Sequence, residues 1–130
     1  ATAARLTLPE DEPDMSMDKQ TIEHFLHGQI DCWNRGDKQG FFGHYRSVSP
    51  NGLSIEYVGK PQHDAWQVLE GMWAQQQPKI RVEVRQCIVN GIEAACHHLN
   101  AFREQEGGIE TIELYRFEEG RLFVRYFINQ

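Results

Sequence analysis

The chain has 130 residues, of which 40% are hydrophobic and 25% are charged, and this is enough for one domain around one core. Its formal net charge of -6 at pH 7 argues against nucleic acid and anionic lipid as partners, because both are bound by clustered Lys and Arg. No apolar run approaches the roughly 20 residues of a membrane-spanning helix, so we expect a cytoplasmic protein that does not contact a membrane.

Residues 1–16, ATAARLTLPEDEPDMS, contain two prolines and little apolar periodicity, which predicts an extended or flexible N-terminal arm. A single domain is expected over residues 17–130. From Asp18 onward, apolar side chains recur at spacings of three and four, as on the buried face of an amphipathic helix. This stripe comprises Ile22, Phe25, Leu26, Ile30 and Trp33.

Two shorter helices and one strand are predicted next. Gly36 can end the first helix in the left-handed conformation, and Asp37 can cap a second helix that buries an aromatic cluster. The cluster consists of Phe41, Phe42 and Tyr45. Alternating apolar side chains predict a strand over residues 53–58, and Asp64 is the expected cap of a third helix that Pro78 terminates. The buried stripe of this helix is Trp66, Leu69, Met72 and Trp73.

From residue 80 the apolar period changes from 3.6 to 2, which predicts strands at about 80–89, 92–104, 109–117 and 121–129. Helices followed by a meander of strands indicate an α+β fold with an antiparallel sheet. The loop Val89-Asn90-Gly91 favours a three-residue hairpin that places Val82 opposite His98. One face of the sheet would then be mainly apolar, with Ile80, Val82, Val84, Ile88, Ile92, Ala94, Cys96, His98, Asn100 and Phe102.

The loop Glu118-Glu119-Gly120 favours a second three-residue hairpin, which would pair Phe117 with Arg121. Glu113 would then face Arg125 directly on the inward side of the sheet. The outward side would carry a continuous apolar band, too large to leave in water, and we therefore expect a homodimer through this face. The band consists of Leu99, Ala101, Ile112, Leu114, Val124 and Tyr126.

The cysteines Cys32, Cys87 and Cys96 are too few and too scattered for a disulfide framework, so we expect them to be reduced and buried. No CxxC or HExxH spacing is present. His97 and His98 are neighbours in a predicted strand and would point to opposite faces, so they cannot hold one ion together. We therefore expect neither a metal nor an organic cofactor.

The first helix ending in CWNRGD and the closing strands IELYRFEEGRLFVRYF resemble the nuclear transport factor 2-like superfamily, in particular its SnoaL-like and ketosteroid-isomerase-like members. The resemblance covers about residues 18–129. It implies a cone in which a curved antiparallel sheet wraps around three N-terminal helices and leaves a deep pocket. The acid of the ketosteroid-isomerase oxyanion pair matches Glu113, its tyrosine partner aligns with Gln29, and the carboxylate base aligns with Tyr57.

The leading hypothesis is a cofactor-independent acid/base enzyme of isomerase, cyclase, dehydratase or hydrolase type, acting on an apolar, oxygenated small molecule. Glu113 or His98 would move the proton, and Tyr57 would donate a hydrogen bond. The expected substrate-binding side chains are Asn100, Arg125, Tyr115, Trp33, Phe102 and Phe127. The alternative is a non-catalytic ligand-binding or dimerisation module, in which Glu113 and Arg125 form a structural salt bridge.

Overall fold

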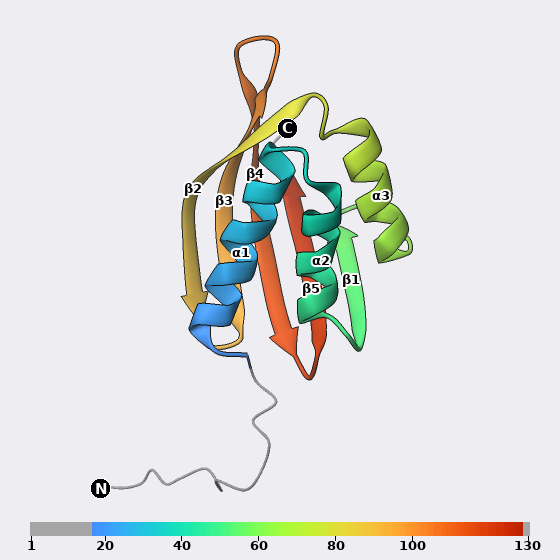
Figure 1. Cartoon of the computed structure of the whole chain (residues 1–130), viewed down its shortest axis with the longest axis vertical. Helices are drawn as coiled ribbons and strands as arrows, with labels where there is room; N and C mark the ends of the chain where they lie inside the picture. Colours follow the sequence, from blue (N-terminus) through green and yellow to red (C-terminus); the bar gives the residue numbers. More distant parts are fainter. Residues whose placement is uncertain (1–16, 129–130) are drawn as a thin grey trace, which may run out of the picture.

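The computed structural model describes residues 17–128, in which three helices pack on one side of a five-stranded sheet (Figure 1). The helices are α1 Lys19–Asn34, α2 Lys38–Val48 and α3 Ala65–Gln75. The strands are β1 Gly52–Tyr57, β2 Ile80–Asn90, β3 Glu93–Phe102, β4 Gly108–Glu118 and β5 Arg121–Ile128. The predicted α+β class is confirmed, while the predicted arm at residues 1–16 lies outside the described residues.

Each helix begins at an aspartate whose carboxylate accepts a hydrogen bond, at 2.8–3.0 Å, from the backbone N–H three residues further on. These aspartates are Asp18, Asp37 and Asp64. Each bond satisfies a backbone donor that the first helical turn would otherwise leave unpaired. The caps predicted from the sequence are therefore present, because this interaction depends only on residues close together in the chain.

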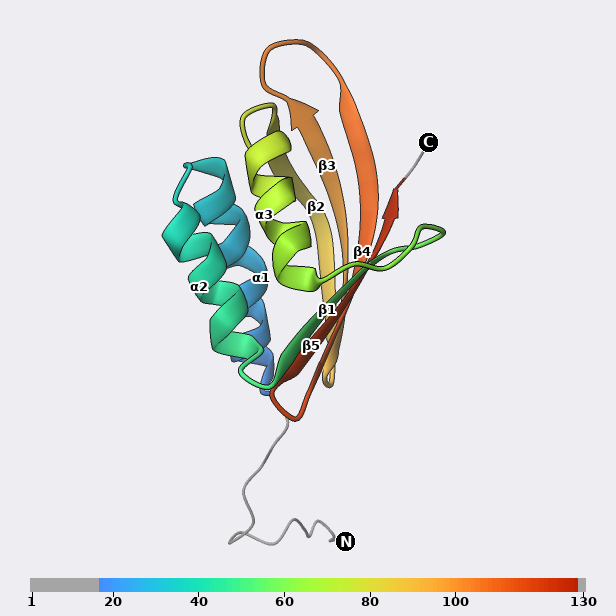
Figure 2. The same cartoon turned by 90° about the vertical axis from the view of Figure 1, so that its right-hand side faces the viewer.

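The sheet has the order β1-β5-β4-β3-β2, and it curves around the helices (Figure 2). Strands β2 to β5 are paired antiparallel as successive hairpins, whereas β1 runs parallel to β5. Buried side chains of the helices and of the concave sheet face form one core. Within residues 17–128, no helix has the length and apolar character that crossing a membrane would require.

The turn between β2 and β3 differs from the predicted three-residue loop. Asn90 pairs with Glu93, so the loop has two residues. The nearby residue pairs of β2 and β3 are therefore shifted from the predicted register by an odd number of residues. Because side chains alternate between the faces, Cys87 and Val89 pack toward the core. Ile88 was predicted to lie inward, but it is 56% exposed.

A β-bulge between Val84 and Gln86 restores the predicted faces along the rest of this hairpin. The extra residue in β2 reverses the alternation once more, so Val84 pairs with His98 and Val82 pairs with Asn100. His98 is only 2% exposed and shares its face with buried Val82. The inward position of His98 is therefore confirmed, although its predicted partner was wrong.

The turn between β4 and β5 also has two residues, and here no bulge compensates. Glu118 pairs with Arg121, and the turn residues Glu119 and Gly120 have φ angles of 54° and 74°. Positive φ at both positions matches the twist of the adjoining strands, which favours this turn. Every side chain of β5 therefore lies on the face opposite to the prediction. The buried residues of this strand are Leu122, Val124 and Tyr126.

The predicted inward pairing of Glu113 with Arg125 is wrong. Glu113 pairs with Tyr126 in the sheet, and Arg125 lies on the outer face together with Phe127. There, Arg125 Nε donates to Glu56 Oε1 at 3.1 Å, since the parallel β1 places Glu56 beside it. The acid on the inner face is thus separated from the cation that was expected to neutralise it.

The apolar band on the outer face changes for the same reason. Val124 and Tyr126 were predicted to belong to it, but they are buried. Phe123 and Phe127 take their places, and Phe123 is 40% exposed. The other predicted members keep their place on the outer face of β3 and β4: Leu99, Ala101, Ile112 and Leu114.

Cys87 and Cys96 form a disulfide between β2 and β3, which corrects the prediction that all three cysteines are reduced. The two residues are direct partners in the register, with Cα atoms 4.2 Å apart. Cys32 is a free, buried thiol on α1, as predicted. The spacing of the cysteines in the sequence does not indicate the pair, because Cys87 shares the inner face with Val82 and Val84 only through the two-residue turn and the bulge in β2.

The contact between α1 and α2 contains a histidine whose protonation opposes folding. The rings of His24 and His44 lie 5.3 Å apart, and Gly28 leaves the space that the His44 ring fills. Burial, followed by the positive charges of His24 and Arg35, lowers the pKa of His44 below 6.5. The negative charges of Asp37, which precedes α2, and Asp31, which lies on α1, raise the pKa of His44 and so oppose this shift.

We expect His44 to make the protein less stable in mild acid. The unfolded chain takes up the proton more readily than the folded chain, so its contribution is complete above about pH 6.5 and falls as the pH drops further. His44→Gln should remove this component. Thermal melts between about pH 7.5 and 5.5 should therefore show a smaller loss of melting temperature in the variant. Equal losses in both proteins would contradict the assignment.

Candidate functional site

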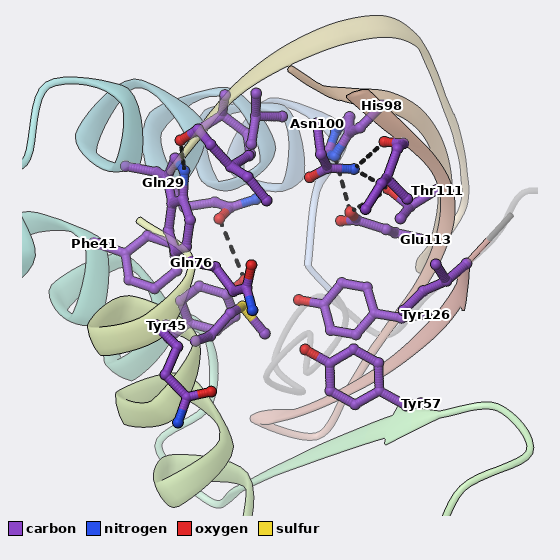
Figure 3. Close-up of a pocket in the computed structure, with 18 of the residues that line it drawn as sticks. Gln29, Phe41, Tyr45, Tyr57, Gln76, His98, Asn100, Thr111, Glu113 and Tyr126 are labelled. Carbon is purple, nitrogen blue, oxygen red and sulfur yellow. Dashed lines mark hydrogen bonds and ion pairs between the residues drawn. The ribbon is translucent and has the colours of Figure 1, made fainter. Parts of the chain in front are cut away.

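A cavity of about 650 Å³ lies between the concave face of the sheet and the helices (Figure 3). Its apolar wall includes Ile30, Trp33, Phe41, Met72, Ile80, Val82, Ile109 and Ile128. Its polar side chains include Gln29, Tyr45, Tyr57, His98, Asn100, Thr111, Glu113 and Tyr126. A largely apolar hollow with a few convergent polar groups is typical of a small-molecule site.

Glu113 is a carboxylate buried in this cavity wall, with 7% of its surface exposed. Its Oε2 atom accepts a hydrogen bond from the Thr111 hydroxyl at 3.1 Å, and Oε1 accepts one from the Tyr115 hydroxyl. His98 Nδ1 lies 3.0 Å from the same Oε2 atom. Among residues 17–128, no Lys or Arg forms an ion pair with Glu113. Neutral donors and one imidazole therefore surround the acid.

His98 and Glu113 form a buried pair from neighbouring strands. When Glu113 is a carboxylate, Nδ1 of His98 carries the ring hydrogen and donates a hydrogen bond to Glu113 Oε2. Nε2 then has a lone pair and makes no hydrogen bond with any residue that the structure describes. Since His98 lines the cavity, Nε2 is the atom available to a ligand. The pair thus has the arrangement of a base held in one tautomer by an acid.

Asn100 extends this pair into a short chain of hydrogen bonds. Its amide nitrogen donates to Ile109 O at 2.9 Å and to Thr111 Oγ1 at 3.0 Å, and Thr111 in turn donates to Glu113. Figure 3 shows these side chains together on the sheet wall, opposite the aromatic rings of the helices. Both amide hydrogens of Asn100 are therefore used, and its oxygen remains as an acceptor for a ligand.

Tyr57 and Tyr126 supply two phenol groups on the same side of the cavity. Their rings lie 5.2 Å apart, and both hydroxyls point into the cavity (Figure 3). Burial, with the nearby Glu113 charge, raises the pKa of Tyr57 to about 12, and burial raises the pKa of Tyr126 well above 10. Both phenols stay protonated near neutral pH, so they can donate hydrogen bonds to a ligand oxygen.

The helix side of the cavity contributes Gln29 and Tyr45. The Tyr45 hydroxyl donates to Gln29 Oε1 at 3.3 Å, and both residues are buried. Burial raises the pKa of Tyr45, and the charge of Glu113 adds to this effect. Sequence reasoning assigned Tyr45 to the core and Tyr126 to the outer face. Only the correct β5 register would have shown Tyr126 as a cavity residue.

The cavity brings together five of the side chains that the sequence singled out: Glu113, His98, Tyr57, Asn100 and Trp33. Tyr115 lies inward but behind the cavity wall, where it donates to Glu113. Phe102 lies at the end of β3 and does not line the cavity. The prediction that Arg125 and Phe127 line the cavity is wrong, because both side chains lie on the outer face of the sheet.

No protein-family model matches the sequence, and no curated protein sequence matches it significantly. Solved structures do match. An NTF2-like protein of unknown function from Cytophaga hutchinsonii superimposes with a TM-score of 0.64 at 10% identity, over 87% of this chain and 93% of its own. An LEH-like epoxide hydrolase from M. tuberculosis gives 0.62 at 11% identity, over 85% and 84%. A de novo designed NTF2 fold protein gives 0.63 at 18%, over 87% and 88%.

The chain has the nuclear transport factor 2-like fold. The fold implied by the sequence resemblance is therefore confirmed, with a curved sheet around three helices. The sheet is mixed and not wholly antiparallel as predicted, because β1 runs parallel to β5. At these identities the likeness establishes the fold alone. Because the nuclear transport factor 2-like fold is shared by a hydrolase and by a designed protein, the chemistry must be argued from the cavity itself.

Proposed function

We propose that the protein is an acid/base enzyme that acts on an apolar small molecule carrying a carbonyl or epoxide oxygen. The observation that carries this proposal is the buried His98–Glu113 pair, which lines a cavity of about 650 Å³. Lys60 also lines this cavity, but no Lys or Arg among the described residues forms an ion pair with Glu113. A salt-bridged acid would be held idle, whereas this pair can exchange a proton with a bound molecule.

The proposed reaction begins with removal of a proton by His98 Nε2. For a ketone, the proton leaves the carbon beside the carbonyl and the electron pair moves onto the carbonyl oxygen. For an epoxide, the proton leaves an attacking water and the C–O bond of the ring breaks. Both routes place negative charge on one oxygen, and the neutral phenols of Tyr57 and Tyr126 can stabilise it. Glu113 stabilises the imidazolium through Nδ1.

Solvent isotopes test the proposal without knowledge of the physiological substrate. A panel of cyclic ketones and epoxides is incubated with the protein in D₂O or in ¹⁸O-labelled water. Mass spectrometry should then show deuterium beside a carbonyl or one ¹⁸O in a diol, faster than with His98→Gln. Binding is followed separately through the tryptophan fluorescence of the protein, to which Trp33 in the cavity wall contributes together with Trp66 and Trp73. Ligands that bind but acquire no label would overturn the catalytic proposal.

One observation favours the non-catalytic alternative. Both oxygens of Glu113 already accept hydrogen bonds, and no polar side-chain atom that is fully enclosed within the described part of the chain lacks a partner. A fully satisfied network of this kind can shape a binding site without taking part in a reaction. The same isotope experiment separates the alternatives, because a binding module would change the tryptophan fluorescence without transferring a proton.

Tyr57→Phe tests the phenol donors. Loss of the hydroxyl should lower kcat by roughly 10²-fold, the effect of removing one donor to a developing oxyanion. Stability should change little, because Tyr57 is only partly buried. The matched control is Tyr45→Phe, which removes a hydroxyl that hydrogen-bonds Gln29 on the helix side. If both variants lower kcat equally, Tyr57 has no special role.

We also propose that the outer face of the sheet forms a homodimer. Ile112 and Phe123 are 43% and 40% exposed there, beside a groove of about 420 Å³ that Leu114 and Phe123 help to line. Apolar patches of several hundred Å² usually mark an interface, and a sheet face can pair with a second copy of itself.

Leu114→Glu should convert the dimer to monomers, because it places a charge in the proposed contact. The control Gln67→Glu adds the same charge to an exposed position on α3 and should leave the dimer intact. Sedimentation velocity at micromolar concentration measures both. An unmodified protein that already sediments as a monomer would refute the proposed interface.

A further inference from the structure

Beneath the cavity, three side chains of β2 and β3 bring metal-ligating atoms together. The Sγ atoms of Cys87 and Cys96 and a ring nitrogen of His98 all lie within 4.8 Å of one another. Cys96 and His98 are each 2% exposed, and Cys87 is partly buried. Two sulfur atoms and one imidazole form a ligand set that zinc prefers.

The backbone places Cys87 in this cluster by a specific irregularity. Cys96 and His98 are two residues apart in β3, so they share the inner face. In an unbroken β2, Val82 and Val84 would point inward and Cys87 would point outward. The bulge between Val84 and Gln86 reverses the alternation and turns Cys87 inward, opposite Cys96. Bulges are known to redirect side chains next to functional sites.

Glu113 prepares His98 for a metal. Its Oε2 atom lies 3.0 Å from Nδ1 of the imidazole, and its other contacts hold the carboxylate in place. A carboxylate that accepts a hydrogen bond from one ring nitrogen fixes the ring and makes the other nitrogen a better ligand. The cluster therefore combines two sulfur atoms and an imidazole with an acid that hydrogen-bonds the imidazole.

We propose that the protein, when its Cys87–Cys96 disulfide is reduced, binds Zn²⁺ through Cys87, Cys96 and His98. A thiol reductant supplies two electrons and two protons and becomes a disulfide, whereas a phosphine supplies two electrons, takes its oxygen from water and leaves the two protons of that water. In both cases the S–S bond breaks and gives two thiols. Zinc then replaces both thiol protons. The two thiolates balance the charge of the ion, which a poorly solvated site requires.

The disulfide and the metal exclude one another. Two sulfur atoms bound at about 2.3 Å to a tetrahedral zinc lie roughly 3.7 Å apart, so the S–S bond must be open. Binding should therefore occur only in the reduced protein. This inference does not depend on the proposed enzymatic function, although zinc on His98 would withdraw the imidazole from the cavity.

Cobalt provides the spectroscopic test. The full chain is reduced with a thiol-free phosphine and titrated with Co²⁺ under anaerobic conditions. We expect a thiolate-to-cobalt charge-transfer band and the visible bands of a tetrahedral site, both saturating at one equivalent and both lost when Zn²⁺ is added. The oxidised protein should show neither band. The absence of a charge-transfer band in protein whose thiols are shown to be free would overturn the proposal.

Variants locate the site. Cys96→Ser should remove most of the charge-transfer band, whereas Cys32→Ser, which changes the buried thiol on α1, should leave it unchanged. Glu113→Gln should weaken zinc binding about 10–100-fold, as measured by competition with a chromophoric chelator. Circular dichroism confirms that each variant is folded. A band that depends on Cys32 rather than on Cys96 would place the metal elsewhere and refute the assignment.

Discussion

Glu113→Gln is expected to lower turnover of any substrate found by isotope labelling by about 10²–10⁴-fold, the usual contribution of a positioned acid/base group. The amide keeps the volume of the side chain, but its single oxygen can accept from only one of Thr111 and Tyr115, which donate to different oxygens of Glu113. It cannot stabilise an imidazolium on His98 by its charge, and this is the property that the mechanism requires. Ligand affinity, measured through tryptophan fluorescence, should change little.

The chain contains a matched control for this variant. On the outer face of the same two strands, His97 Nε2 lies 2.6 Å from Glu110 Oε1, so a second His–Glu pair is present away from the cavity. Glu110→Gln makes the identical chemical change and should leave turnover unaffected. If Glu113→Gln keeps full activity, or if it lowers the melting temperature while both activity and binding persist, Glu113 is a structural residue.

Phe25→Ala is expected to lower the free energy of unfolding by about 3–5 kcal/mol, a large part of the roughly 5–15 kcal/mol typical of a domain. Phe25 is 1% exposed and occupies the centre of an aromatic cluster. Its ring centroid lies 4.9 Å from Tyr45, 6.0 Å from Tyr115 and 5.7 Å from Phe117. The remaining rings are held by α2 and β4, so they can move only partly into the space that Phe25 leaves.

Urea denaturation followed by circular dichroism measures this loss. Phe102→Ala removes the same atoms from a half-buried residue outside the core cluster, and it should cost about 1 kcal/mol or less. Since Tyr115 supports Glu113, Phe25→Ala should also lower turnover in the fraction that folds. Similar midpoints for the two variants would show that the Phe25 cluster can repack.

The predicted elements were most accurate where the interactions are local. The caps at Asp37 and Asp64 depend on a carboxylate and a backbone N–H three residues away, and both are present. Along one strand, alternation also predicted that Glu113, Tyr115 and Phe117 share the inner face, which is confirmed by their burial. The acid at the centre of the candidate site could therefore be recognised from the sequence.

The partners of that acid could not be predicted, because they depend on the turns. Glu119-Gly120 is compatible with a two-residue or a three-residue loop, and the choice reverses every side chain of β5. Both faces of β5 are apolar enough to be buried, so composition does not decide between them. The prediction placed Arg125 beside Glu113, whereas the fold places Tyr126 there.

By itself, the sequence determined the helices, the strands and, outside the bulge in β2, the face that each residue shares with its neighbours in the same strand, since these properties arise from contacts over a few residues. The tertiary structure decided which residues of neighbouring strands lie opposite each other. The parallel contact of β1 with β5 gives Arg125 its partner Glu56, and the bulge in β2 turns Cys87 toward Cys96. Both outcomes depend on segments that meet only after the chain has folded, and so the complete site is a property of the sheet as a whole.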